Sequence, residues 1–279
     1  MPRRITVLDL HKKKADNEKI VMVTAYDYTM ARLVDKAGMD MVLVGDSLGM
    51  VVQGHADTLP VTTEHMIYHT RCVSRALQRA HLVADMPFMS YQISATDALA
   101  SAGRLVKEGA AQSVKLEGGE RSAEAIAHIV EAGIPVVGHV GLTPQSVHAM
   151  GGFRVQGRSD AAADQVVRDA LAVQEAGAFC IVLEGMPTDV AAEITARLDI
   201  VTVGIGAGPH CDGQVLVCND ILGMDLSFSP RFVKRYAQLE ETAVEAFSAY
   251  AEEVRESVFP GPEHSFTRKR APRRLAKLY

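Results

Sequence analysis

The sequence contains no tryptophan, and its aromatic residues amount to only 5% of the chain. So low an aromatic content is unlike a β-sandwich or an aromatic carbohydrate-binding surface. Its only cysteines are Cys72, Cys180, Cys211 and Cys218, and none of them forms a C-x-x-C pair. Their wide spacing argues against a structural zinc site and predicts reduced thiols in a cytoplasmic protein.

Membrane and nucleic-acid functions are not expected either. No run of 18 apolar residues is present, and the charged N-terminal segment is not followed by the apolar stretch of a signal peptide. Residues 267–279 hold six Lys and Arg and no acid, so the remaining 23 basic and 34 acidic residues give residues 1–266 a net charge of -11. Phosphate binding needs a basic surface, and the acidic body therefore argues against nucleic acid. The basic tail, 267–279, is expected to be a disordered extension.

Short apolar segments rich in valine alternate with helical patterns along the chain. Strands that are apolar on both faces are typical of a parallel sheet covered by helices. The eight segments begin at Ile20, Met39, His81, Ser113, Ile134, Phe179, Ile200 and Gln214. Eight strand–helix units in about 250 residues predict an α/β fold, a (β/α)8 TIM barrel forming a single domain over residues 1–266. An open doubly wound sheet is the alternative, although it would usually have fewer strands.

Helix ends are marked by glycines that we expect to adopt the left-handed conformation before the next strand. These glycines are Gly38, Gly109, Gly133 and Gly177. After the barrel, Ser229-Pro230 predicts the start of a helix. The remaining residues to Val258 predict one or two C-terminal helices that cover the barrel or a neighbouring subunit.

Polar residues end the predicted strands, and in such barrels the active site lies at the C-terminal ends of the strands. They are Asp27, Asp46, Ser47, Asp85, Lys115, Glu117, His139, Glu184 and the run from Gly204 to Gly206. A single Asp after a strand is usually a helix N-cap or turn residue. Carboxylates from four strands that point inward would instead repel one another and need a cation. Oxygen ligands favour Mg²⁺ over Zn²⁺, because only one histidine is available at these ends.

The alternation of side chains along a strand predicts toward which face these polar residues point. It places Val42, Val44 and Asp46 on one face of their strand, and Val182 and Glu184 on one face of theirs. If the valines point into the barrel, the carboxylates point into its mouth.

Other candidate sites are weaker. His65 and His69 stand four residues apart on a predicted helix but lack the glutamate of H-E-x-x-H, so a helix face near the barrel wall is the favoured interpretation. The glycines of residues 204–208 are compatible with phosphate binding or with a tight turn. Residues 150–158, with three glycines and two arginines, predict a substrate-binding lid or a plain solvated loop.

Motifs along the chain, above all VGDSLGMV, VKLEGG and GHVGLTPQ, resemble those of the ketopantoate hydroxymethyltransferase family. TAYDY, VADMPF, GGFRVQGR, IVLEG and FPGPEHSF support the resemblance, which covers about residues 5–266. Together they distinguish this family from the more distant isocitrate lyase and phosphoenolpyruvate mutase barrels. Met89 departs from the pattern, because the family usually has a small residue there.

The resemblance implies transfer of a one-carbon unit from 5,10-methylenetetrahydrofolate to 3-methyl-2-oxobutanoate (2-oxoisovalerate), which gives ketopantoate for pantothenate and coenzyme A synthesis. It also implies a homo-oligomer, commonly a decamer, with one Mg²⁺ in each subunit. The implied metal ligands are Asp46, Asp85 and Glu117. The implied substrate contacts are Asp46, Ser47, Asp85 and Lys115, with Glu184 as the proton acceptor and His139 beside the metal.

The residue types suit that chemistry. A cation held by the carboxylates would polarise the keto group of a 2-oxo acid and stabilise the enolate formed next to it. Lys115 adds positive charge where the oxyanion develops, and Glu184 removes the proton from the adjacent carbon. His139 either hydrogen-bonds the substrate or shuttles a proton. The alternative function is a lyase or mutase of the related barrels, acting on another 2-oxo acid without folate.

Overall fold

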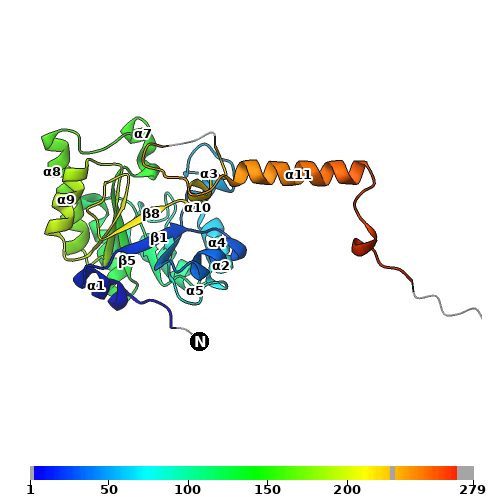
Figure 1. Cartoon of the computed structure of the whole chain (residues 1–279). Helices are drawn as coiled ribbons and strands as arrows, with labels where there is room; N and C mark the ends of the chain where they lie inside the picture. Colours follow the sequence, from blue (N-terminus) through cyan, green and yellow to red (C-terminus); the bar gives the residue numbers. More distant parts are fainter. Residues whose placement is uncertain (1–2, 227–229, 269–279) are drawn as a thin grey trace, which may run out of the picture.

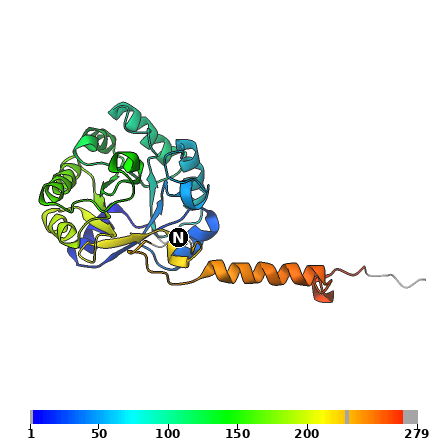
Figure 2. The same cartoon turned by 90° about the horizontal axis from the view of Figure 1, so that it is seen from above.

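Eight parallel strands close into a barrel in the computed structural model, which describes residues 3–226 and 230–268 (Figures 1 and 2). Each strand pairs with the strands before and after it in sequence, and the last pairs with the first. They are β1 (Ile20–Thr24), β2 (Met41–Val44), β3 (His81–Asp85), β4 (Ser113–Lys115), β5 (Val136–Gly141), β6 (Cys180–Glu184), β7 (Val201–Ile205) and β8 (Gly213–Leu216). The predicted barrel is confirmed, and each apolar segment coincides with one strand.

Helices between the strands form the ring that surrounds the barrel in Figure 2. The longer ones are α2 (Tyr28–Lys36), α4 (Thr63–Ser74), α5 (Ala95–Lys107), α6 (Ala123–Glu131), α8 (Asp160–Glu175) and α9 (Thr188–Arg197). The short ones are α3 (Leu48–Val51), η1 (Glu120–Ser122), η2 (Pro144–Ser146), α7 (Val147–Met150) and α10 (Cys218–Leu222). Within the described ranges, no helix is long and apolar enough to cross a membrane.

Two apolar clusters hold this architecture together. The larger one joins the helices to the outer faces of the strands. The smaller one fills the barrel interior and includes Ile5 and Leu10 from the N-terminal segment. Leu10 lies on α1 (Val7–Ala15), whose Lys14 ammonium donates hydrogen bonds to the carbonyls of Leu198 and Ile200. The N-terminal segment therefore packs against one end of the barrel core, and the functional cavity lies at the other.

The condition that the valines point into the barrel fails for β2 and holds for β6. Val42 and Val44 belong to the outer cluster and Leu43 to the interior one. Asp46 nevertheless reaches the barrel mouth, because β2 ends at Val44 and the alternation of a strand does not extend into the turn that follows. Along β6, Val182 belongs to the interior cluster and Glu184 lines the cavity above it.

Three of the four helix-ending glycines have the expected left-handed conformation, with φ of 85° at Gly38, 83° at Gly133 and 95° at Gly177. Gly109 does not, because helical hydrogen bonds continue past it and Ala110 takes the positive φ of 61° instead. A Cβ on Gly109 would lie 2.5 Å from the carbonyl oxygen of Leu105, so close packing is what requires glycine there.

Another non-glycine residue with a left-handed backbone conformation lies in the loop after β3. Met89, where the resembled family usually has a small residue, has φ of 65° and is half-exposed. This backbone conformation disfavours side chains, which gives a physical reason for a small residue at this position.

The C-terminal prediction needs a correction. Residues 230–238 are not helical, and Ser229 lies outside the described residues. Instead Arg231 and Phe232 line the cavity at the barrel mouth, while the Tyr236 amide donates to the carbonyl of Ile221. The helix α11 begins only at Leu239 and runs to Arg255, and a short turn, η3 (Pro262–His264), follows. Figures 1 and 2 show α11 projecting away from the barrel. Most of the predicted basic tail, from residue 269 onward, also lies outside the described residues.

Candidate active site

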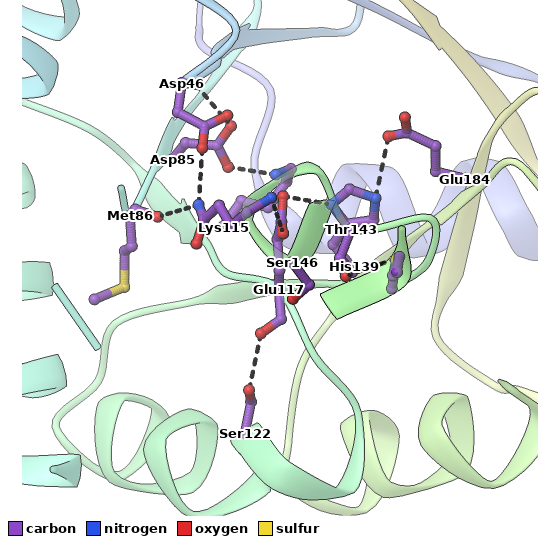
Figure 3. A network of polar contacts seen from close by, with 12 residues as sticks. Asp46, Asp85, Met86, Lys115, Glu117, Ser122, His139, Thr143, Ser146 and Glu184 are labelled. Atoms are coloured by element: carbon purple, nitrogen blue, oxygen red, sulfur yellow. Dashed lines mark hydrogen bonds and ion pairs between the residues drawn. The ribbon is translucent and has the colours of Figure 1, made fainter. Parts of the chain in front are cut away.

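A cavity of about 790 Å³ opens at the C-terminal ends of the barrel strands. All seven site residues proposed from the sequence line it, and Figure 3 shows six of them in one network of polar contacts. They are Asp46, Ser47, Asp85, Lys115, Glu117, His139 and Glu184. The expectation that the ends of separate strands bring these side chains together is therefore confirmed as geometry.

The strand register explains part of this arrangement. Asp85 and Lys115 are the last residues of β3 and β4, and they are directly paired across the sheet. Glu184 is the last residue of β6 and pairs with Gly141 of β5, two residues beyond His139. Parallel neighbours end at the same level, so polar residues at strand ends meet without any specific long loop.

Three carboxylates are buried together at the centre of the network. The exposed fractions of Asp46, Asp85 and Glu117 are 4%, 2% and 1%. Burial, followed by the charges of Asp85 and Glu117, raises the pKa of Asp46 to about 8. Burial also raises the pKa of Asp85, although Lys115 opposes it. The cluster is thus electrostatically unfavourable when all three groups are ionised.

Lys115 places a buried positive charge in the site. Its Nζ lies 2.5 Å from Oδ1 of Asp85, and both side chains are almost wholly buried. Burial lowers the pKa of Lys115, but the charges of Asp85, Glu117 and Asp46 outweigh burial and raise it overall. The ammonium form is therefore favoured in the cavity wall, where it can stabilise negative charge on a bound oxygen.

His139 lies between two carboxylates on opposite sides of its ring. Nδ1 is 3.5 Å from Oε1 of Glu117, and Nε2 is 3.2 Å from Oε2 of Glu184. Neither nitrogen makes a well-directed hydrogen bond, so these are ion-pair contacts. Burial and the charge of Lys115 lower the pKa of His139, yet the two carboxylates outweigh them and raise it to about 9. Glu184 is the more accessible partner, because its side chain is 17% exposed while that of Glu117 is 1% exposed.

The carboxylates of Asp46, Asp85 and Glu117 suit a cation that prefers oxygen ligands. They line one cavity, and burial together with the charges of neighbouring acids raises the pKa values of Asp46 and Asp85, a cost that a bound cation would offset. Across residues 3–226 and 230–268, no three His, Cys, Asp or Glu side chains already converge on a common metal position. The fit therefore rests on the chemistry of the donor set, and the carboxylates must turn toward the ion to bind it.

Several residues of the site had no role predicted from the sequence. The Tyr26 hydroxyl lies 2.9 Å from the Ser47 hydroxyl, and the buried Gln145 contacts both Asp46 and Glu117. Gln145 stands in the GHVGLTPQ motif, which is its only signal in the sequence. A glutamine in a turn after a strand is otherwise indistinguishable from an exposed loop residue.

The other residues that the sequence offered as candidates have structural roles. Oδ1 of Asp27 accepts from the Met30 amide and caps α2. His65 accepts a hydrogen bond from the amide of Thr62, the N-cap residue of α4, whereas Nδ1 of His69 is 2.7 Å from the carbonyl oxygen of Tyr26. Neither histidine lines the cavity, which favours the helix-face interpretation.

The glycine-rich segments border the cavity. Gly206 and Gly208 line it and have positive φ values of 61° and 80°, as a tight turn requires. From the loop at residues 150–158, Phe153 and Val155 line the cavity, so this loop is placed to contact a ligand.

Replacing Asp46 by Asn should stabilise the metal-free protein at alkaline pH. A carboxyl whose pKa rises on folding, here from 3.8 to about 8, costs stability progressively as the pH increases through that interval. We expect Asp46→Asn and the wild type to differ little near pH 4 and the variant to be more stable at pH 8 by up to about 5 kcal/mol, each kcal/mol raising Tm by roughly 2–4 °C. Thermal unfolding in EDTA measures both.

Asp40→Asn is the matched control for that experiment. Asp40 is buried too, but it lies 3.3 Å from the Lys13 ammonium and accepts a hydrogen bond from the Val21 amide. Its removal should lower Tm at pH 8. If the Tm values of Asp46→Asn and the wild type changed with pH in the same way, the Asp46 carboxylate would not cost stability at alkaline pH, and the prediction would be wrong.

Comparisons with known proteins agree in sequence and in fold. The profile of the family described as "Ketopantoate hydroxymethyltransferase" matches residues 4–262. A 3-methyl-2-oxobutanoate hydroxymethyltransferase of Syntrophotalea carbinolica is 60% identical, covering 96% of this chain and 100% of its own length. The protein of that name from Geobacter sulfurreducens is 55% identical with the same coverage.

Solved structures resemble the chain in fold at low identity. A 2,3-dimethylmalate lyase, a member of the PEP mutase/isocitrate lyase superfamily, has a TM-score of 0.60 at 16% identity and covers 97% of this chain and 93% of its own. Phosphonopyruvate hydrolase, solved as a complex with oxalate and Mg²⁺, has a TM-score of 0.60 at 14% identity and covers 92% of both chains. At such identities the likeness concerns the barrel fold alone.

Proposed function

The chain belongs to the ketopantoate hydroxymethyltransferase family, and from that premise we propose that it transfers a hydroxymethyl group from 5,10-methylenetetrahydrofolate to 3-methyl-2-oxobutanoate. The product is ketopantoate (2-dehydropantoate), which is used in pantothenate and coenzyme A synthesis. One observation carries the proposal: the three acids, the lysine and the His139–Glu184 pair all line one cavity at the barrel mouth. A 2-oxo acid needs charge stabilisation at its oxygens and a base at its adjacent carbon, and this cavity offers both.

We assign Asp46, Asp85 and Glu117 as the residues that hold one Mg²⁺ in each subunit. When bound, the ion supplies Lewis-acid polarisation of the keto oxygen. Asp46, Ser47, Asp85 and Lys115 form the wall that the oxo acid contacts. Lys115 places its ammonium beside Asp85, from where it stabilises negative charge on a substrate oxygen.

We assign Glu184 as the base that removes the proton from C3 of the substrate. It is the more exposed of the two carboxylates that flank His139, so it can reach a bound ligand. His139 holds Glu184 on one side and Glu117 on the other, and this contact supports an orienting and proton-holding role for the imidazole. The deprotonated carbon then forms a C–C bond with the one-carbon unit, both C–N bonds of that unit to the folate break, and water supplies the hydroxyl group. The proton taken from C3 and one proton of the water end on the two folate nitrogens.

The test is product analysis with purified enzyme, Mg²⁺, 2-oxoisovalerate and 5,10-methylenetetrahydrofolate. Equal amounts of ketopantoate and tetrahydrofolate are expected, with one water consumed. Omission of the folate should abolish ketopantoate formation. Cleavage of a 2-oxo acid in the absence of folate would instead support the alternative, a lyase of the related barrels.

We also propose that the chain acts as a homo-oligomer, with the decamer as the expected assembly. None of the residues of α11 is buried, and its Val244, Phe247 and Val254 lie on one helix face with exposed fractions of 59%, 72% and 44%. An apolar helix face of this kind is typical of a surface that another protein chain covers. The four free thiols are compatible with the cytoplasmic location expected from the sequence.

The double variant Phe247→Glu/Val254→Glu is expected to sediment as smaller particles than the wild type, because charge on this face opposes its burial. Sedimentation velocity measures the difference. Tyr68→Glu, which changes an exposed residue of α4, is the control and should leave the particle size unchanged. A wild-type monomer would refute the proposal of a homo-oligomer.

A further inference from the structure

Gln145 connects two acids that come from different strands. It lies in η2, directly after β5, and is only 5% exposed. Its side-chain Nε2 donates to Oδ2 of Asp46 at 2.8 Å and to the carbonyl oxygen of Met86 at 3.0 Å. Its Oε1 accepts from the Tyr91 hydroxyl at 2.6 Å. The amide therefore uses both of its donors and its acceptor inside the protein.

The orientation of this amide follows from its neighbours. The carbonyl of Met86 can only accept, so the amide group facing it must be the NH₂. Gln92 donates to Oε1 at 3.1 Å, which agrees with that assignment. With the amide fixed in this way, the oxygen of Asp46 that it contacts always faces a donor.

The same residue holds Glu117 through the main chain. The Gln145 amide N–H donates to Oε2 of Glu117 at 3.0 Å. The Tyr91 hydroxyl, which donates to Gln145, also accepts from the Glu117 amide at 3.1 Å. Asp46 in turn donates its own amide N–H to Oδ2 of Asp85 at 3.1 Å. Contacts starting at Gln145 thus reach all three acids of the buried cluster.

We propose that Gln145 is a positioning residue that sets the orientation of the Asp46 carboxylate and thereby the affinity of the site for a divalent cation. This inference rests on the metal assignment made in the proposed function. Residues that hydrogen-bond to metal ligands orient them, and their loss commonly weakens metal binding by about 10- to 100-fold. Gln145 acts through Asp46 and does not itself ligate the ion.

Side-chain substitution isolates this effect. The hydrogen bond from the main-chain amide to Glu117 survives any replacement at position 145 except proline. Gln145→Met keeps the length of the side chain and removes only its hydrogen bonds to Asp46, Met86, Tyr91 and Gln92. Any change in cation affinity then comes from the lost side-chain contacts of Gln145, foremost the one to Asp46, rather than from its main-chain hydrogen bond to Glu117.

The experiment titrates Mg²⁺ alone, without substrate, into the wild type and into Gln145→Met by isothermal calorimetry. A Kd about 10- to 100-fold weaker is expected for the variant. Gln92→Leu is the matched control, because Gln92 also bonds the Gln145 amide but touches none of the acids; its Kd should stay within about threefold of the wild-type value. A lower Tm with an unchanged Kd in Gln145→Met would mean that Gln145 is only structural and would overturn the proposal.

A second variant covers the case in which Gln145→Met does not fold. Tyr91→Phe removes one hydroxyl, which donates to Gln145 and accepts from the Glu117 amide. It should weaken Mg²⁺ binding less than Gln145→Met does, but measurably, and unchanged binding would count against the positioning role. If the wild type itself bound no Mg²⁺, the metal part of the proposed function would fail, and this inference with it. If the wild type bound Mg²⁺ and both variants bound it equally well, only the inference about Gln145 would be overturned, and the metal assignment would stand.

Discussion

Glu184→Gln is expected to bind 2-oxoisovalerate and Mg²⁺ normally but to exchange the C3 proton of the substrate with deuterated water about 100- to 10,000-fold more slowly. The change keeps the size of the side chain and removes its ability to accept a proton. Asp46, Asp85 and Glu117 cannot replace it, because they are buried and engaged with Gln145, Lys115 and His139. Proton NMR of the substrate in deuterated water, without folate, measures the exchange.

Glu193→Gln serves as the control for that measurement. Glu193 is a carboxylate on α9 that pairs with Arg197 at the exposed surface. Its loss should leave the exchange rate unchanged. Exchange at the wild-type rate in Glu184→Gln would remove Glu184 as the base, and His139 would then be the next group to replace.

The site could be predicted from the sequence because its residues stand at or just beyond strand ends. In a parallel barrel, strand ends converge on one mouth whatever the details of the helices between them. Asp85, Lys115 and Glu184 each end a strand in the structure. A polar residue that follows an apolar run in the sequence therefore predicts a side chain at the barrel mouth. The roles of these residues came from the resemblance, because geometry alone does not distinguish a base from a metal ligand.

Local patterns were less reliable where the chain leaves regular structure. Asp46 reaches the cavity from a turn after β2, so the strand alternation used to orient it did not apply. Pro230 carries a helix-start signal, yet only a turn follows it, closed by the Val233 amide donating to the Pro230 carbonyl, and Phe232 in this turn lies against Gly206. Tertiary contacts there take precedence over local propensity. Gln145 was missed for a related reason, since its importance depends on partners that are 28 and 99 residues away.

Lys115→Met is expected to lower the free energy of unfolding by about 3–5 kcal/mol at pH 8, besides abolishing activity. The ammonium is the buried positive charge 2.5 Å from Asp85, and its loss leaves the three acids without that compensation. Asp85 has a raised pKa even with Lys115 present, and without the lysine that pKa should rise further. A carboxyl with a raised pKa costs stability only above its ordinary value of 3.8, so the loss should be smaller at pH 5 than at pH 8. Urea unfolding in EDTA at both pH values measures it.

The double variant Lys115→Met/Asp85→Asn separates stability from function. It removes both charges of the pair, and replacing a buried ion pair by neutral groups is often neutral or stabilising. We therefore expect it to regain most of the stability that Lys115→Met loses, while remaining inactive because it lacks both a proposed metal ligand and the lysine. A double variant no more stable than Lys115→Met would mean that the uncompensated charge of Asp85 is not the cause of the loss, because the two variants differ only at that residue. Recovery of stability without recovery of activity would mean that Lys115 and Asp85 are retained for the reaction, since the barrel folds as well without their charges.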